Sequence, residues 1–321
     1  MKKYIVSTIN FILNKFGLAL HTREEIWERD VYAKLYESRI KHVPDPGMYP
    51  AECIVFSKDR ALQLHALLSS YLEKVASPVP LYIMYQTSTS SHQKAYEEVV
   101  EIFSKKNIIF KKQDSGDSFR SDLILLLESV HSEKIFFLVD DVLFIEDFDI
   151  QDFVKFDTDK FVPTLRMGLN LNTCYTLQKN QQVPELVPDM IEDDDKITWQ
   201  WDRGIYDWSY PLSLDGHFFS AQEIKTMIPL IDFSAPNTLE DQLQHFRRFF
   251  LFRKGIAYHK SRIVNIPCNK VQKENKNIHG SRHQDFLLEQ WQKGYQMDYR
   301  QLYGFNNTSA HQEISFSFIR R

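Results

Sequence analysis

The pattern of apolar and polar positions predicts strands that alternate with helices between residues 51 and 150. Short apolar runs typical of buried strands occupy residues 53–56, 81–85, 108–111 and 135–139. Between them, apolar residues recur at helical spacing, as in Leu64, Leu67, Leu68, Tyr71 and Val75. Such alternation indicates βαβ units with right-handed crossovers. We therefore predict an α/β fold with a Rossmann-type, mostly parallel central sheet flanked by helices.

The strongest candidate for a ligand site is the stretch KIFFLVDDVLFIEDFD, residues 134–149. Its apolar run ends at two adjacent acids, Asp140 and Asp141. Ligands of open α/β sheets bind outside the carboxyl ends of the strands, so these acids could hold a cation or a ribose. A turn with two solvated acids is the alternative interpretation. The sequence has no GxGxxG or GxxxxGK loop in this half, so phosphates would need another positive partner, and a divalent metal held by the acids would supply it.

The pattern is less regular beyond residue 150. The aromatic-rich stretch WQWDRGIYDWSYPLSLDGHFF could fill the core or offer platforms for a flat ligand such as a sugar ring, and core filling is the safer prediction. Residues 236–250 predict a helix, in which Thr238 and Asp241 have the spacing of a capping box. That spacing gives Asp241 a purely structural explanation. A strand is expected within 256–267.

Prolines and a glycine in VPDPGMYP predict a boundary before the first strand. We expect an N-terminal helical extension, a large α/β domain of two halves, and a C-terminal helix with an irregular tail. These units are predicted to span residues 1–45, 46–284 (halves 51–150 and 151–284) and 285–321.

The N-terminal segment combines two lysines with apolar residues. Ile5, Ile9, Ile12 and Phe16 fall at helical spacing, although neither a spanning helix nor a cleavable signal is evident. An amphipathic helix here could pack on its own domain. The functional alternative is peripheral contact with a membrane through residues 1–20.

Composition narrows the class of protein. The chain of 321 residues is long enough to bury a sizeable core, and its net charge of −4 with interspersed signs argues against a nucleic-acid partner. Three widely spaced cysteines, Cys53, Cys174 and Cys268, argue for a reducing compartment. We predict a cytoplasmic protein, which the N-terminal segment could hold at the inner face of the membrane.

Three motifs make residues 51–283 resemble a nucleotide-sugar-dependent glycosyltransferase of the GT-A type. The opening IVFSKDRALQLHALLSSY is similar to the start of family-two-like members, and the resemblance implies that Ser57, Asp59 and Arg60 lie near the nucleotide. The stretch FLVDDVLF is similar to the DXD-type motif, whose acids contact the ribose and the metal. The stretch NTLED is similar to the xED element that supplies the base in inverting members.

The resemblance implies a metal site with Mn²⁺ or Mg²⁺. Because Val142 cannot ligate a cation, we align the motif so that Asp140 takes the ribose side and Asp141 the metal. Members of this fold often add a C-terminal histidine ligand, for which His259 and His279 are both candidates.

The reaction implied is transfer of a sugar from a UDP- or GDP-linked donor to a hydroxyl of a glycan or lipid-linked glycan, with inversion. Asp241 is the expected base, with Glu240 or Asp215 as alternatives. Bacterial surface polysaccharide assembly is the setting that such transferases suggest.

Other residues are expected on the donor side. Arg120 or Lys134 could stabilise the departing diphosphate. Gly216 and His217 lie in an aromatic-flanked loop, where the glycine would allow close backbone approach, although a simple turn explains them equally well.

Two other classes of function compete with this prediction. A nucleotidyltransferase would share the sheet and the acids, but the sequence lacks the Gly-rich triphosphate loop usual in that class. A non-catalytic carbohydrate- or partner-binding protein could keep the fold without the chemistry.

Overall fold

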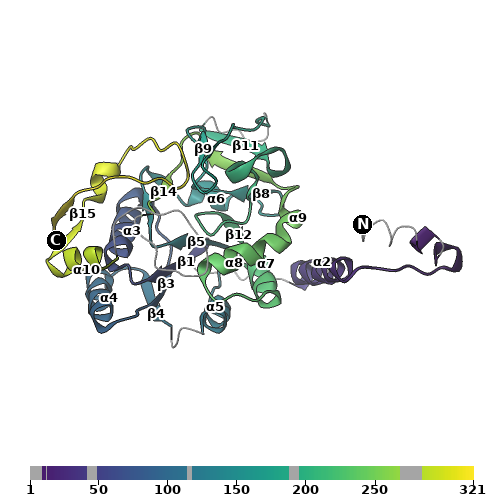
Figure 1. Ribbon diagram of the computed structural model, residues 1–321, viewed down its shortest axis with the longest axis horizontal. Helices are drawn as coiled ribbons and strands as arrows, with labels where there is room; N and C mark the ends of the chain where they lie inside the picture. Colours follow the sequence, from purple (N-terminus) through teal and green to yellow (C-terminus); the bar gives the residue numbers. More distant parts are fainter. Residues whose placement is uncertain (1–8, 12, 42–48, 114–117, 188–194, 268–283) are drawn as a thin grey trace.

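The computed structural model describes residues 9–11, 13–41, 49–113, 118–187, 195–267 and 284–321. Its centre is a five-stranded sheet with the order β12-β5-β1-β3-β4 (Figure 1). The strands are β1 (Ala51–Lys58), β3 (Leu81–Gln86), β4 (Ile108–Lys112), β5 (Lys134–Val139) and β12 (Phe218–Ser220). The first four are parallel, and β12 runs antiparallel to β5. The predicted α/β class with a mostly parallel central sheet is confirmed.

The chain reverses direction across the sheet between β1 and β5. Helices α3 (Ala61–Lys74) and α4 (Ser90–Phe103) carry it outward from β1 to β3 and β4, and α5 (Phe119–Glu128) brings it back to the far side of β1. Ligands of open α/β sheets bind at such a switch point, outside the carboxyl ends of the strands. The ends of β1 and β5 therefore define the place to look for a site.

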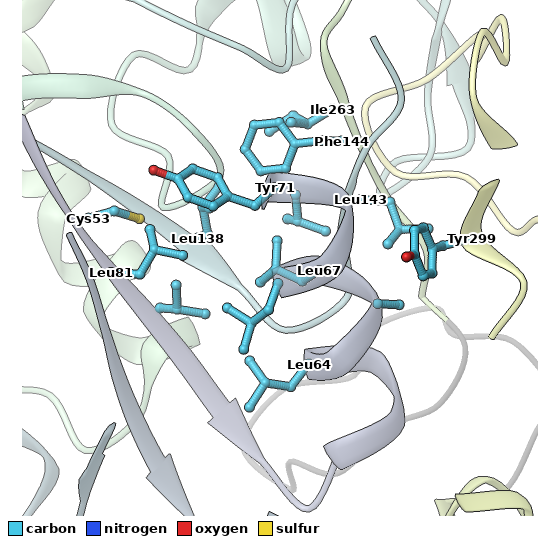
Figure 2. Packing of buried hydrophobic residues seen from close by; sticks show 14 of the residues in the cluster. Cys53, Leu64, Leu67, Tyr71, Leu81, Leu138, Leu143, Phe144, Ile263 and Tyr299 are labelled. Carbon is cyan, nitrogen blue, oxygen red and sulfur yellow. The ribbon is translucent and has the colours of Figure 1, made fainter. Parts of the chain in front are cut away.

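Alternation along the strands divides the core into two layers. Cys53 and Val55 of β1 face the cluster built around α3, whereas Ile54 and Phe56 face the cluster that contains α5 and α7 (Ala221–Met227). Figure 2 shows the first layer, where the leucines of α3 meet residues of β1, β3 and β5 together with Tyr299 from the C-terminal region. Both layers draw on residues before and after 150, so the two predicted halves share one core.

The rest of the chain builds smaller sheets and short helices around the main sheet. A three-stranded sheet has the order β11-β13-β8, and β14 pairs with β6. Residues 254–265 thus form two strands, where the sequence predicted one. The remaining strands are β2 (Val75–Ala76), β6 (Val142–Phe144), β7 (Phe148–Asp149), β8 (Phe161–Pro163), β9 (Thr173–Cys174), β10 (Lys179–Asn180), β11 (Lys196–Gln200), β13 (Lys254–Tyr258) and β14 (Ile263–Asn265). The helical segments are η1 (Asn14–Phe16), α6 (Gln151–Val154), η2 (Trp201–Arg203), η3 (Tyr206–Ser209), η4 (Ile228–Leu230), α8 (Pro236–Leu243), η5 (Gln244–Phe246) and α9 (Arg247–Phe250).

The aromatic-rich stretch fills the core. Trp199, Trp201 and Trp208 are fully buried, and the Trp199 indole donates a hydrogen bond to the backbone oxygen of Trp208. Gly255 is required beside them, because a Cβ there would lie 2.2 Å from a ring atom of Trp199. These tryptophans pack against the three-stranded sheet β11-β13-β8 and form part of the core, so we assign them no ligand-binding role.

The two ends of the chain pack on opposite flanks (Figure 1). Helix α2 (Arg23–Lys41) lies against α7 and buries Val31 and Leu35. The predicted C-terminal helix is present as α10 (Gln284–Gln292), and the tail after it carries short strands and a 3₁₀ turn that pack on α3 together with that helix. The elements of the tail are β15 (Tyr295–Met297), η6 (Tyr299–Leu302) and β16 (Phe318–Arg320). Of the helices in the described ranges, none has the length and apolar character needed to cross a membrane.

A buried ion pair joins α7, which packs beside the central sheet, to the residue that precedes β13 of the three-stranded sheet. Glu223 of α7, 1% exposed, accepts hydrogen bonds of 2.8 and 2.7 Å from the two terminal nitrogens of Arg253, which also donates to the Thr158 carbonyl. Removing one partner would leave an uncompensated buried charge.

We therefore expect Glu223→Gln to lower the free energy of unfolding by about 3–5 kcal/mol. The matched control is Glu28→Gln, which breaks the more exposed pair with Arg248 and should cost about 1 kcal/mol or less. Urea denaturation measures both variants. Equal losses in the two variants would contradict the special role of the buried pair.

Candidate functional site

Asp140 is the best-anchored acid of the site. It follows β5 directly and is 3% exposed. One carboxylate oxygen accepts hydrogen bonds from the Ser57 hydroxyl (2.9 Å) and the Lys58 amide (3.1 Å), and the other accepts from Arg60 Nη1 (2.8 Å). Asp140 thus ties the end of β5 to the end of β1, at the switch point.

The turn after β1 is built to present Arg60. Asp59 has a φ of +54°, and its carboxylate accepts a 2.7 Å hydrogen bond from the Ser88 amide. The Tyr96 hydroxyl lies 2.5 Å from the Ser57 hydroxyl and accepts a hydrogen bond from the Arg60 amide. Of the predicted residues, Ser57 and Arg60 therefore bond Asp140, whereas the Asp59 carboxylate bonds the Ser88 amide and shapes the turn.

Asp141 faces outward from this anchor. Both acids border a narrow crevice, together with Gln63, Leu143, Ile266 and Met297. The Asp141 side chain is 14% exposed, against 4% for Asp140, and one oxygen lies 3.3 Å from Arg60 Nη1. Burial raises the pKa of Asp141 to about 6, and neighbouring carboxylates add to the rise while Arg60 opposes it.

Asn265 connects Asp141 to a second acid, Asp215. Its Nδ2 donates a 3.5 Å hydrogen bond to Asp141 and also bonds Asp215. Its Oδ1 is buried, and no residue in the described ranges donates a hydrogen bond to it. The Asn265 side chain thus combines an oxygen acceptor without a donor with two neighbouring carboxylates, and oxygen ligands of this kind suit a hard cation.

Asp215 lies between two cationic side chains. His311 Nε2 and Arg166 Nη1 are each 3.4 Å from its Oδ2. Burial alone would raise the pKa of Asp215, but these partners outweigh it and lower the pKa to about 2. Asp215 is therefore an ionised acid near neutral pH.

Arg166 was not predicted from the sequence. It is buried and donates to the Ser213 hydroxyl (2.6 Å) and to Asp207 (3.1 Å) as well as to Asp215. A buried guanidinium needs such a set of acceptors. The sequence offers no local signal for it, because its partners lie 41 to 49 residues further along the chain.

Glu240 of α8 belongs to the same electrostatic cluster. Burial, together with the charge of Asp215, raises the pKa of Glu240 to about 7, although Arg166 and His311 oppose the rise. A carboxyl group with this pKa can accept a proton near neutral pH.

Asp241, the adjacent residue, has an exposed side chain. The capping-box arrangement expected for it is wrong, because α8 begins at Pro236 and the Thr238 hydroxyl instead accepts from the Ser234 and Ala235 amides.

His311 reaches the site from the C-terminal region. The segment around it lies along β14, where the Asn265 amide donates to the Ala310 carbonyl (3.0 Å) and the Gln312 amide donates to the Asn265 carbonyl (2.9 Å). Burial alone would lower the pKa of His311, but Asp215 raises it overall. The resemblance implied a histidine ligand in the C-terminal part of the chain, but nothing in the local sequence distinguishes His311 from the other histidines.

The other histidines considered lie elsewhere. His259 is exposed, and its backbone amide bonds the Asp195 carbonyl. His279 lies outside the described residues. His217 is fully buried, with Nδ1 3.0 Å from the Pro211 carbonyl, and burial lowers its pKa to about 3. His217 is therefore a neutral core residue.

Three further predicted residues have structural explanations. Arg120 donates to the carbonyls of Ile231 and Pro229. Lys134 begins β5, at the end of the strand opposite Asp140, and pairs with Glu133. Gly216 has a φ of +71°, and a Cβ there would lie 2.7 Å from the Ile263 side chain, so the glycine permits packing rather than ligand approach.

Comparison with family models finds no match to this sequence. No curated protein sequence matches it either.

Solved structures of similar fold include glycosyltransferases. S. aureus TarS is 14% identical over 67% of this chain, with a TM-score of 0.45, and the match covers only 36% of TarS. TarS 1–349 in complex with UDP-GlcNAc is 14% identical, with 74% of this chain and 63% of that chain covered and a TM-score of 0.45. This chain thus spans about a third of TarS and less than two thirds of the fragment.

Two further matches are more distant. Mannosyltransferase PcManGT from Pyrobaculum calidifontis, in complex with GDP-Man and Mn²⁺, is 14% identical over 42% of each chain, with a TM-score of 0.30. The 4-diphosphocytidyl-2C-methyl-D-erythritolsynthase from Anaerococcus prevotii is 12% identical over 75% of this chain and 96% of that chain, with a TM-score of 0.38. Glycosyltransferases are thus among the solved structures that match this chain, each at low identity and with a TM-score below 0.5.

Proposed function

We propose that this protein is a glycosyltransferase that moves a sugar from a nucleoside-diphosphate sugar to an acceptor hydroxyl. The observation that carries the proposal is the group of charged side chains at the switch point of the parallel sheet. Four carboxylates and three cationic side chains gather there from distant parts of the chain: Asp140, Asp141, Asp215, Glu240, Arg60, Arg166 and His311.

The donor would bind outside the ends of β1 and β5. Asp140 is too buried and too fully bonded to contact a ligand by itself, so we assign it to holding Ser57 and Arg60 in place. Arg60 then offers positive charge to the diphosphate, which these loops cannot bind through glycine amides. Asp141, the more exposed acid, faces the crevice.

Mn²⁺ or Mg²⁺ fits the oxygen donors beside that crevice. Asp141 and the Oδ1 of Asn265 would hold it, and the ion would neutralise charge on the departing diphosphate. Within the parts of the chain that the structure describes, no three His, Cys, Asp or Glu side chains converge as a metal site. Two protein ligands suffice when substrate phosphate and water complete the shell.

Glu240 is our candidate for the base. In the transfer, the acceptor hydroxyl oxygen bonds to the anomeric carbon and gives its proton to Glu240. The bond from that carbon to the diphosphate breaks, and its electron pair leaves with the diphosphate. Asp215, held ionised by Arg166 and His311, is a weaker base and instead sets the charge around Glu240. A single base without a protein nucleophile implies inversion.

The acceptor is proposed only by its chemistry, as a hydroxyl of a glycan or lipid-linked glycan. Tyr210 lies near Glu240, and burial followed by the Glu240 charge raises the pKa of its hydroxyl, so it stays protonated and able to donate a hydrogen bond. Cys53 and Cys174 are free thiols, which suits the cytoplasmic setting in which surface polysaccharides begin.

The first test separates the two adjacent acids of α8. We expect Glu240→Gln to lower kcat by about 10²- to 10⁴-fold, because the base is lost, and Asp241→Asn to retain most activity. The assay measures release of UDP from UDP-GlcNAc or of GDP from GDP-Man, with water or added glycans as acceptor. Nucleotide affinity should be unchanged in both variants. Loss of turnover in Asp241→Asn alone would assign the base to Asp241.

The second test is the pH profile of kcat/KM. Glu240 must be ionised to accept a proton, so kcat/KM should fall as the pH drops below about 7. His311→Gln removes positive charge that favours ionised Glu240, so the acid limb should move to higher pH. His245→Gln, an exposed histidine next to α8, should leave the limb in place. A limb that stays fixed in His311→Gln contradicts this role.

The third test concerns the metal. We expect Asp141→Asn and Asn265→Ala each to weaken Mn²⁺-dependent binding of UDP or GDP by at least about tenfold, as measured by calorimetry. Asp147→Asn, at a highly exposed acid, is the matched control. Equal affinity in wild type with Mn²⁺ and with EDTA would remove the metal from the proposal and leave Arg60 as the diphosphate partner.

A further inference from the structure

Residues 9–11 and 13–20 begin with helical backbone, continue through η1 and end in a loop that polar contacts close. The Asn10 side chain donates to the Leu20 carbonyl (2.8 Å) and accepts from the Leu20 amide (2.6 Å), which closes the loop. Gly17, with a φ of +69°, ends a short 3₁₀ turn by donating to the Asn14 carbonyl. The Asn10 side chain is therefore turned inward, toward the backbone.

The apolar side chains of this loop point outward. Phe11 is 72% exposed and Phe16 is 74% exposed, and Ile9, Leu18 and Leu20 are exposed as well. This is the reverse of a segment that packs on its own domain. Isolated exposed apolar residues are ordinary, but five within twelve residues form a surface that needs a partner.

The loop is held away from the body of the protein. Figure 1 shows it beyond the far end of α2, on the side remote from the central sheet. Helix α2 is fixed to the body through buried Val31 and Leu35 and through Trp27, which packs on Phe246. The loop is thus presented by an anchored helix and leaves the candidate active site uncovered.

The N-terminal segment carries a net positive charge, whereas the whole chain is net negative. Residues 1–22 contain three of the 39 basic residues, Lys2, Lys3 and Lys15, and none of the 43 acidic ones. Lys15 Nζ lies 5.6 Å from the centre of the Phe11 ring, so positive charge accompanies the exposed aromatic surface. A second copy of the same loop would bring like charges together, whereas an anionic surface would not.

We propose that residues 9–11 and 13–20 dock on an anionic phospholipid bilayer, with Phe11, Phe16 and Leu18 entering the interface and Lys15 contacting headgroups. The described helices do not span a membrane, so the attachment is peripheral. The acyl boundary would take up the apolar side chains, and the negative surface would attract the lysines.

The test is sedimentation of the full chain with vesicles of phosphatidylcholine alone or with 30 mol% phosphatidylglycerol. Wild type should bind the anionic vesicles and release them at high salt. Phe11→Ser with Phe16→Ser should weaken binding at least about tenfold, and Lys15→Ala about fivefold. Phe252→Ser is the matched control, because Phe252 is 85% exposed elsewhere and its loss should leave vesicle binding unchanged.

Three results would overturn the proposal. The first is wild type that fails to sediment with anionic vesicles, and the second is a double variant that sediments as wild type does. The third is a wild-type dimer that the double variant converts to a monomer, which would assign the loop to contact between copies. Donor turnover in solution should be the same in the double variant and wild type, so the result is independent of the proposed chemistry.

Discussion

The site depends on the burial of one carboxylate, that of Asp140. A buried ionised acid is stable only when its oxygens are bonded, and the end of β1 supplies the bonds through Ser57, the Lys58 amide and Arg60. The same bonds fix the turn after β1 and hold the guanidinium of Arg60 at the switch point. Both acids border the crevice, and Asp141 has the more exposed side chain of the two. The buried charge of Asp140 thus helps to position Asp141 and Arg60 at the switch point of the sheet.

Charge balance then separates the roles of the remaining acids. Arg166 and His311 both bond Asp215, so its pKa falls despite burial. The pKa of Glu240 rises because burial and the negative charge of Asp215 disfavour its ionised form more than Arg166 and His311 favour it. Two carboxyl groups whose pKa values are moved apart can act as a fixed charge and as a proton acceptor, respectively. This division rests on the surroundings of each acid, which the sequence motif does not describe.

The sequence predicted the features that depend on local periodicity. The four parallel strands and the acids after β5 follow from short apolar runs and helical spacing, which report burial directly. The sequence could also have shown which of the two acids of α8 is the more buried. Leu239 and Leu243 mark the buried face, and at about 100° per residue Asp241 points away from that face while Glu240 lies at its edge. The motif resemblance favoured Asp241, whereas the helical phase favours Glu240.

The residues that escaped prediction are those brought in by long-range contacts. His311 meets Asp215 almost a hundred residues away, through a backbone segment that pairs with β14 outside any regular hairpin. No periodic pattern marks such a segment, because only a short stretch of its backbone is paired. The proposed donor site and the proposed acceptor site are therefore assembled from different kinds of contact. Ser57, Arg60 and Asp140 are set by neighbouring strands of one sheet, whereas the charge around Glu240 is complete only when the C-terminal segment lies on β14.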